Sequence, residues 1–95
     1  MNIREDGPGN RHVYKILPRT EWEHACRVGA YAGSPDDLRD GFIHLSAANQ
    51  VAATAARHFR GIRDLVLVAL DPEALGEALK WELSRGGALF PHYYG

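Results

Sequence analysis

The stretch Asp40-Gly41-Phe42-Ile43-His44-Leu45-Ser46 decides the fold that we expect, because it indicates a turn, a short strand and the start of a helix. Gly41 permits the turn, residues 42–45 favour a strand, and Ser46 is a good N-cap for the alanine-rich stretch that follows. Since side chains alternate across a strand, one face is apolar and the other carries the imidazole of His44. A histidine beside a helix N-terminus lies where backbone N–H groups attract anions, so the stretch predicts a ligand site. The alternative is a core histidine whose ring bonds a neighbouring backbone group.

The composition is that of an ordinary globular protein. The chain has 95 residues, of which 45% are hydrophobic and 24% charged, and its formal net charge is −1. We therefore expect a flexible leader over residues 1–11 and a single α+β domain over residues 12–95. Without clustered lysines and arginines, neither a nucleic acid nor a membrane is expected as a partner.

The two ends of the chain and its one cysteine bear on its location. Cys26 is the only cysteine, so no intramolecular disulfide can form, and we expect it to be a small buried side chain. The leader lacks the apolar core of a signal peptide, which favours a cytoplasmic protein. The aromatic ending at Gly95 leads us to expect further residues in the natural product.

The other segments predict an α+β fold of small mixed sheets with two main helices. We expect strands over residues 12–17, 65–70, 78–83 and 88–94, one helix capped by Thr20 and ended by Gly29, another over residues 47–59, and a helical turn over residues 72–75. The uninterrupted apolar run at 65–70 indicates a central strand buried on both faces. Pro91 confines the last strand to an edge or an irregular crossing.

Several chemically unusual residues come from segments that are far apart in the chain. In a small fold they can converge on one cleft with aromatic walls and a few polar groups, which is typical of ligand sites. We predict His44, Glu82 and His92 as catalytic residues, and Tyr14, Lys15, Tyr31, Ser46, Trp81, Arg85 and Tyr94 as ligand-binding residues.

Three of these assignments have alternatives. Lys15, a charge in an otherwise apolar strand, is either a ligand contact or a solvated edge residue, and residue frequencies favour the solvated position. Glu82 beside aromatic residues has a raised pKa and acts as a general base, or else it is a surface carboxylate paired with Arg85. His44, Glu82 and His92 also suit zinc in a metal hydrolase, but they lack the helical i, i+4 spacing, so we assign no metal.

In order, these motifs resemble a family of small, mainly bacterial proteins known as domain-of-unknown-function family 952. The most specific pieces are residues 40–46 and Phe90-Pro91-His92-x-Tyr94-Gly95. Further matching pieces are Val13-Tyr14-Lys15-Ile16, Trp22, Gly29-x-Tyr31, Gln50, Phe59, Leu65 to Leu70 and Trp81-Glu82. The resemblance covers nearly the whole chain from Val13 onward.

The resemblance implies a fold similar to the ADP-ribosyltransferase-like group, whose members bind NAD in a cleft between two small sheets. Residues 41–46 and the helix after them are similar to the segment that places hydroxyls beside the nicotinamide ribose. Lys15 looks like the position of a nucleotide-holding histidine or arginine, and Glu82 or a histidine replaces the transferase glutamate.

Two functions follow as hypotheses. The first is a protein that binds a nucleotide or NAD, with ADP-ribosyl-type transferase chemistry as one outcome. The second is a non-enzymatic protein-interaction module whose binding patch is the aromatic segment with Phe90, Tyr93 and Tyr94. The substrate, the existence of turnover and the oligomeric state stay open.

Overall fold

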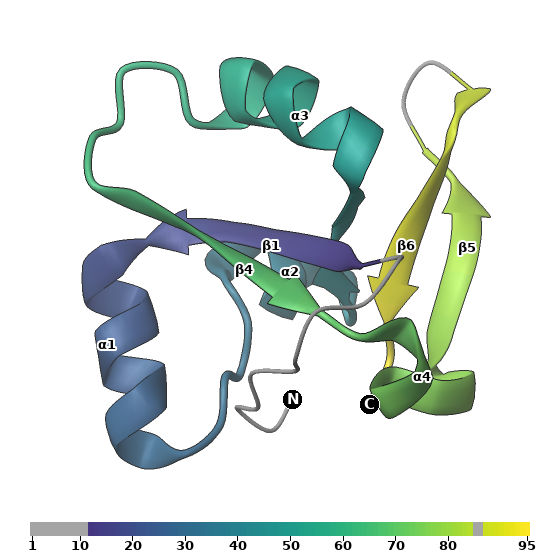
Figure 1. The fold of residues 1–95 in the computed structure, drawn as a ribbon, viewed down its shortest axis with the longest axis horizontal. Coiled ribbons are helices and arrows are strands. Elements are labelled where there is room, and N and C mark those ends of the chain that lie inside the picture. Colours follow the sequence, from purple (N-terminus) through teal and green to yellow (C-terminus); the bar gives the residue numbers. More distant parts are fainter. Residues whose placement is uncertain (1–11, 85–86) are drawn as a thin grey trace.

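Two antiparallel sheets form the framework of the chain in a computed structural model that describes residues 12–84 and 87–95 (Figure 1). Within these residues, the strand orders are β3-β1-β4 and β2-β6-β5. The strands are β1 (Val13–Pro18), β2 (Ile43–His44), β3 (Ser46–Ala47), β4 (Leu65–Leu70), β5 (Leu79–Leu83) and β6 (Leu89–Tyr93). The helices are α1 (Arg19–Val28), α2 (Pro35–Asp40), α3 (Val51–His58) and α4 (Pro72–Leu75), with 3-10 turns at Ala48–Gln50 and Gly76–Ala78.

The α+β class is confirmed, and α1 and α3 are the two longest described helices, with ten and eight residues. The sheets are antiparallel, whereas we expected mixed sheets. The predicted leader and Arg85 lie outside the described residues. No helix within residues 12–84 and 87–95 is long and apolar enough to cross a membrane.

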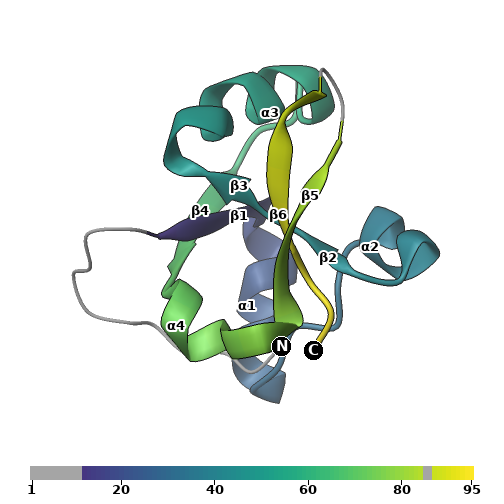
Figure 2. The ribbon, with the colours of Figure 1, turned by 90° about the vertical axis from the view of Figure 1, so that its right-hand side faces the viewer.

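The first sheet is centred on β1. This strand pairs with β4 over its whole length and with β3 at Val13 and Tyr14. Figures 1 and 2 show α1 and α3 on opposite sides of this sheet. Our prediction of β4 as the central strand was wrong, since it is an edge strand on which Leu67 is 53% exposed. An uninterrupted apolar run therefore does not by itself imply burial on both faces.

The core lies between the first sheet, α1 and the strand crossing at residues 43–45. Its buried members come from both sheets, from α1 and from the loop that follows α1. They are Val13, Leu17, Ala25, Tyr31, Ile43, Leu45, Val68 and Leu70. The split that we predicted for residues 42–45 is confirmed, because Ile43 and Leu45 are buried while Phe42 and His44 are only half-buried.

The second sheet is centred on β6, and Pro91 explains how the chain passes between the sheets. The backbone N–H of Leu45 donates to the Pro91 carbonyl at 3.0 Å, and proline has no N–H to donate in return. Just here β2 ends and β3 begins in the other sheet. We expected Pro91 at an edge or at an irregular crossing. The edge alternative was wrong because β6 is the central strand, and Pro91 lies instead where the segment paired with it crosses between the sheets. The single strand expected over residues 42–45 was also wrong, because this segment divides into strands of two different sheets.

Three local predictions also needed correction. Helix α1 begins at Arg19 after Pro18, one residue before Thr20, so the expected threonine cap does not form. Ser46 lies in β3, and the 3-10 turn that leads into α3 starts after Ala47. Cys26 is exposed because Ala25 and Trp22 supply the packed side of α1. The helix end at Gly29, which has a φ of 91°, and the helical turn over residues 72–75, which Asp71 caps, are both confirmed.

Candidate functional site

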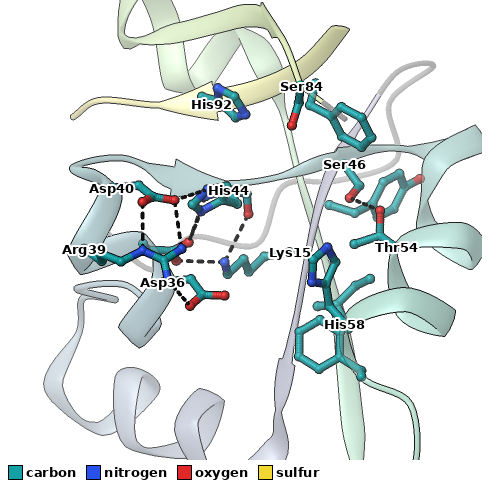
Figure 3. Close-up of a pocket in the computed structure, with 15 residues that line it drawn as sticks. Lys15, Asp36, Arg39, Asp40, His44, Ser46, Thr54, His58, Ser84 and His92 are labelled. Carbon is teal, nitrogen blue, oxygen red and sulfur yellow. Dashed lines mark hydrogen bonds and ion pairs between the residues drawn. The ribbon is translucent and has the colours of Figure 1, made fainter. Parts of the chain in front are cut away.

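A pocket of about 280 Å³ lies where the two sheets, α2 and α3 meet (Figure 3). Its walls combine carboxylates, imidazoles, hydroxyls and aromatic rings. The lining residues are Tyr14, Lys15, Ile16, Asp36, Asp37, Arg39, Asp40, His44, Ser46, Thr54, His58, Phe59, Ser84, Phe90 and His92. Figure 3 shows His44, Asp40 and Lys15 grouped on one side, and Ser46, Thr54 and His58 on the other.

Asp37 is the centre of the polar network, and the sequence of α2 explains its position. Ser34 caps the helix by accepting from the Asp37 backbone N–H at 3.2 Å, while the Ser34 N–H donates to Asp37 Oδ2 at 2.9 Å. Pro35 occupies the first helical position, where its missing N–H costs nothing. This capping box turns the carboxylate inward, where it is 2% exposed.

Lys15 reaches Asp37 from the centre of the first sheet. Its Nζ lies 2.7 Å from Asp37 Oδ2 and donates to the His44 carbonyl at 3.1 Å. The solvated interpretation of Lys15 was therefore wrong, because the side chain is buried and ion-paired. A buried ammonium needs such a partner, since removing one partner would leave an uncompensated charge.

His44 lies between two carboxylates. Its Nδ1 is 2.7 Å from Asp37 Oδ1, and its Nε2 is 3.0 Å from Asp40 Oδ2. The His44 backbone N–H also donates to Asp37 Oδ1 at 3.0 Å. Because a neutral imidazole has one N–H, the ring can donate to both carboxylates only as the imidazolium. His44 is thus held at Nδ1 by a buried group and at Nε2 by the more exposed Asp40.

His92 forms a second carboxylate–imidazole pair beside the first. Its Nδ1 is 2.9 Å from Glu82 Oε1, and the Tyr94 hydroxyl donates to the same oxygen at 2.6 Å. His44 and His92 are register partners on β2 and β6, and their ring centroids are 5.6 Å apart. Phe42 stacks on His92 with a centroid distance of 4.2 Å. The two imidazoles are therefore fixed next to each other on the wall of the pocket.

The contacts of the acidic groups shift their pKa values. Burial alone would raise the pKa of Asp37. Lys15 and the backbone N–H groups of Ser34 and His44 lower this pKa by more than burial raises it, so the net shift is downward. Arg39, and to a lesser extent His44, lower the pKa of Asp40. Hydrogen bonds from Tyr94 and then His92 lower the pKa of Glu82. The raised pKa that we expected for Glu82 was wrong, and this carboxylate stays ionised.

The pocket brings together five of the predicted site residues: Tyr14, Lys15, His44, Ser46 and His92. Glu82 and Tyr94 lie behind His92 and do not line it. Tyr31 is buried and lines a separate hollow beside α1. Trp81 is the register partner of Pro91 and is 47% exposed, so it too lies away from the pocket.

Sequence reasoning missed the acidic residues of α2 and the polar face of α3. The motif Ser34-Pro35-Asp36-Asp37 is typical of a helix start, and this local pattern does not reveal the second role of the Asp37 carboxylate. Thr54 was not singled out because it lies in an alanine-rich helix. Its hydroxyl accepts a hydrogen bond from the Ser46 hydroxyl at 3.3 Å. Within residues 12–84 and 87–95, no group of three or more metal-binding side chains has the arrangement needed to hold a metal ion.

Comparisons with known proteins give a family but no activity. A family model described as "Protein of unknown function (DUF952)" matches residues 16–95. A search of the curated proteins found no match. Protein CC0527 from Caulobacter crescentus, in its X-ray crystal structure, has 59% sequence identity to this chain and a TM-score of 0.84. The match covers 87% of this chain and 73% of that chain. The solution NMR structure of CC0527 is also 59% identical, with a TM-score of 0.77, and covers 87% and 72%.

Proposed function

The chain belongs to the DUF952 family of proteins of unknown function, and we propose that it binds a nucleotide or an NAD-like ligand in the pocket between its two sheets. One observation carries this proposal: His44 and His92, from distant segments, line the same pocket, and each is held at Nδ1 by a carboxylate. Oriented imidazoles of this kind are typical of sites that bind and process polar ligands.

The lining suits the parts of a nucleoside. Carboxylates such as Asp40 accept hydrogen bonds from ribose hydroxyls, and the rings of Phe59 and Phe90 offer an apolar wall for a base. A volume of about 280 Å³ is at the small end of ligand pockets, so one nucleoside unit occupies it. Phosphates extend toward the exposed residues Arg39 and His58.

The proposal includes a fold similar to the ADP-ribosyltransferase-like group, with NAD as the first ligand to test. Two small sheets with a pocket between them support it. When the bond from ribose to nicotinamide breaks, positive charge develops on the ribose, and nearby carboxylates stabilise it. Because Glu82 lies outside the pocket, we assign this role to Asp40. The proposal also includes a cytoplasmic location and no nucleic-acid partner, and a net charge of −1 supports the second of these.

Ligand-dependent stability tests the proposal. We expect NAD, ADP-ribose, AMP or adenosine at one hundred times its Kd to raise the free energy of unfolding by about 2.7 kcal/mol. Thermal unfolding and isothermal titration calorimetry measure this. Asp40→Asn should weaken binding about tenfold, because it removes a charged acceptor from the pocket. Asp64→Asn is the matched control, since Asp64 is exposed and paired with Arg19 away from the pocket.

The outcome is decided by the four ligands together. Binding of at least one, weakened in Asp40→Asn and unchanged in Asp64→Asn, supports the proposal. Absence of a stability change and of heat with all four ligands would refute it.

A second candidate function, a protein-interaction surface, is favoured by a different observation. In the aromatic segment that we predicted for it, Phe90 and Tyr93 are half-buried and Tyr94 is 44% exposed. A pair of more exposed apolar residues lies at the tip of β5 and β6, where Leu83 and Leu89 are register partners and are 72% and 51% exposed. Sedimentation over a range of concentrations tests whether this tip associates, with Leu83→Lys as the variant that should abolish association.

A further inference from the structure

Two imidazoles, each hydrogen-bonded to a carboxylate, line one pocket. Ligand binding alone does not require two such pairs. In one pair Asp37 holds Nδ1 of His44 at 2.7 Å, and in the other Glu82 holds Nδ1 of His92 at 2.9 Å. A carboxylate at Nδ1 fixes the tautomer and leaves Nε2 to exchange protons. Their ring centroids are 5.6 Å apart, so a single bound molecule can meet both rings. The arrangement provides one group to donate a proton and one to accept it.

The charges of the lining indicate which kind of reaction it favours. Among the lining side chains that the structure describes, three carboxylates, from Asp36, Asp37 and Asp40, face two permanent cations, Lys15 and Arg39. Phosphoryl transfer needs an excess of cations around the reacting group. The permanent cations here do not outnumber the carboxylates, and a carboxylate such as Asp40 instead stabilises a transition state that gains positive charge, as when a bond to the anomeric carbon of a sugar breaks.

From these two features we propose that the pocket hydrolyses the N-ribosidic bond of a ribonucleoside or its 5′-monophosphate, an inference that rests on the proposed binding of a nucleoside unit. The bond from ribose C1′ to the base nitrogen breaks, and its electron pair leaves with the base. The imidazolium of His92 donates its proton to the base. Water adds to C1′ and gives its proton to His44, so the products are free base and ribose, or ribose 5-phosphate from a monophosphate. Proton exchange with solvent then restores both imidazoles, and no other reactant is consumed.

His44 can accept this proton in its neutral form. The ring then keeps the Nδ1–H bond to Asp37, and Nε2 becomes an acceptor. Two acceptors do not bond each other, so the exposed Asp40 carboxylate is released from Nε2 and a water molecule takes its place. Asp40 then faces the ribose, where its charge stabilises the transition state.

The second pair is what distinguishes this substrate class from NAD. Nicotinamide leaves NAD as a neutral molecule and needs no proton, whereas a neutral nucleoside loses its base readily only when the base is protonated. A proton donor beside the leaving group is therefore useful for nucleosides and unnecessary for NAD. Glu82 and the Tyr94 hydroxyl position His92 for this role through their shared oxygen.

The test measures release of free base from adenosine, inosine, uridine and AMP by the complete chain in the presence of EDTA. We expect turnover with a bell-shaped pH dependence, because His92 must be protonated while His44 is neutral. His92→Gln should lower the rate about 10²- to 10⁴-fold while nucleoside binding changes only a few-fold. His24→Gln, an exposed histidine outside this pocket, is the matched control and should keep the full rate.

Glu82→Gln tests the positioning role separately. Without the carboxylate the imidazolium of His92 loses its stabilising partner, so the alkaline limb of the pH profile should move to lower pH. A merely structural role would lower the rate without moving this limb. Circular dichroism checks that each variant is folded. The pH profile of the unaltered chain tests the two imidazoles without any variant.

The possible failures can be told apart. If a nucleoside binds but no base is released at any pH, the hydrolysis is refuted while the proposed binding stands. If none of the nucleosides or nucleotides binds, both proposals fail. If base release persists in a folded His92→Gln variant, or if the pH profile of the unaltered chain is flat, the assignment of the two imidazoles is refuted.

Discussion

Lys15 Nζ and Asp37 Oδ2 lie 2.7 Å apart with both side chains buried, although 22 residues separate them in the chain. The pair joins the centre of the first sheet to α2, and the Lys15 ammonium also holds the His44 carbonyl. Lys15→Met would leave the Asp37 carboxylate buried without its cation. We expect the free energy of unfolding, measured in urea, to fall by about 3–5 kcal/mol.

The neighbouring aspartate provides the control for this variant. Asp36 lies one residue from Asp37 on α2, but it is exposed and pairs with Arg39 on the surface. Asp36→Asn should therefore change the free energy of unfolding by less than about 1 kcal/mol. Equal losses from Lys15→Met and Asp36→Asn would show that burial of the ion pair is not what stabilises the fold.

Acid should weaken the fold through Asp37. The pKa of this carboxyl is held below its ordinary value of 3.8, because Lys15 and hydrogen bonds outweigh the opposing effect of burial. Between the pKa of Asp37 in the folded state and its pKa in the unfolded state, the unfolded chain binds more protons. The contribution of Asp37 to the free energy of unfolding is therefore complete above the unfolded-state pKa and is lost as the pH falls through the folded-state pKa. Urea unfolding at a series of acid pH values should show a steeper loss in the unaltered chain than in Asp37→Asn. Parallel curves would contradict this linkage.

Gly33 leaves the space that the Asp37 side chain occupies. Its φ is +118°, and a Cβ added there would meet Asp37 Cβ at 2.9 Å. Gly33→Ala should therefore combine backbone strain of about 1–2 kcal/mol with a displacement of the carboxylate. Gly29→Ala is the control, since its φ is +91° and nothing lies within 4 Å of the added Cβ. We expect both variants to lose stability, but only Gly33→Ala to weaken nucleoside binding in calorimetry.

These contacts show which parts of the site could be predicted from the sequence. Alternation along residues 42–45 correctly placed Ile43 and Leu45 inside and turned His44 toward a polar region. His92 was recognised as a candidate because it belongs to the specific motif Phe90-Pro91-His92-x-Tyr94-Gly95. In both cases the information is local, within one strand or one motif.

The rest depends on how distant segments pack. Asp37 belongs to a six-residue helix, and nothing within that helix indicates that it docks beside Lys15 of β1. A lone charge in an apolar strand left a solvated position open for Lys15, and only its burial requires a buried partner, because an unpaired buried ammonium is too costly. Three nearby aspartates in α2 could have supplied it, and only the packing of α2 selects Asp37. The order of strands was missed for a similar reason, since apolar runs do not specify which strand is central.

Phe42 should control the environment of both imidazoles. Its ring lies 4.2 Å from the His92 centroid and 4.6 Å from the His44 centroid. Phe42→Leu keeps an apolar side chain but removes both aromatic contacts, each contributing about 0.5–1.5 kcal/mol. We expect lower stability together with a downfield shift of the His92 ring protons in the NMR spectrum, because the ring current of Phe42 is lost. Phe59→Leu, which changes an aromatic side chain that lines the pocket, should leave the His92 protons in place, and a similar shift in both variants would contradict the stacking of Phe42 on His92.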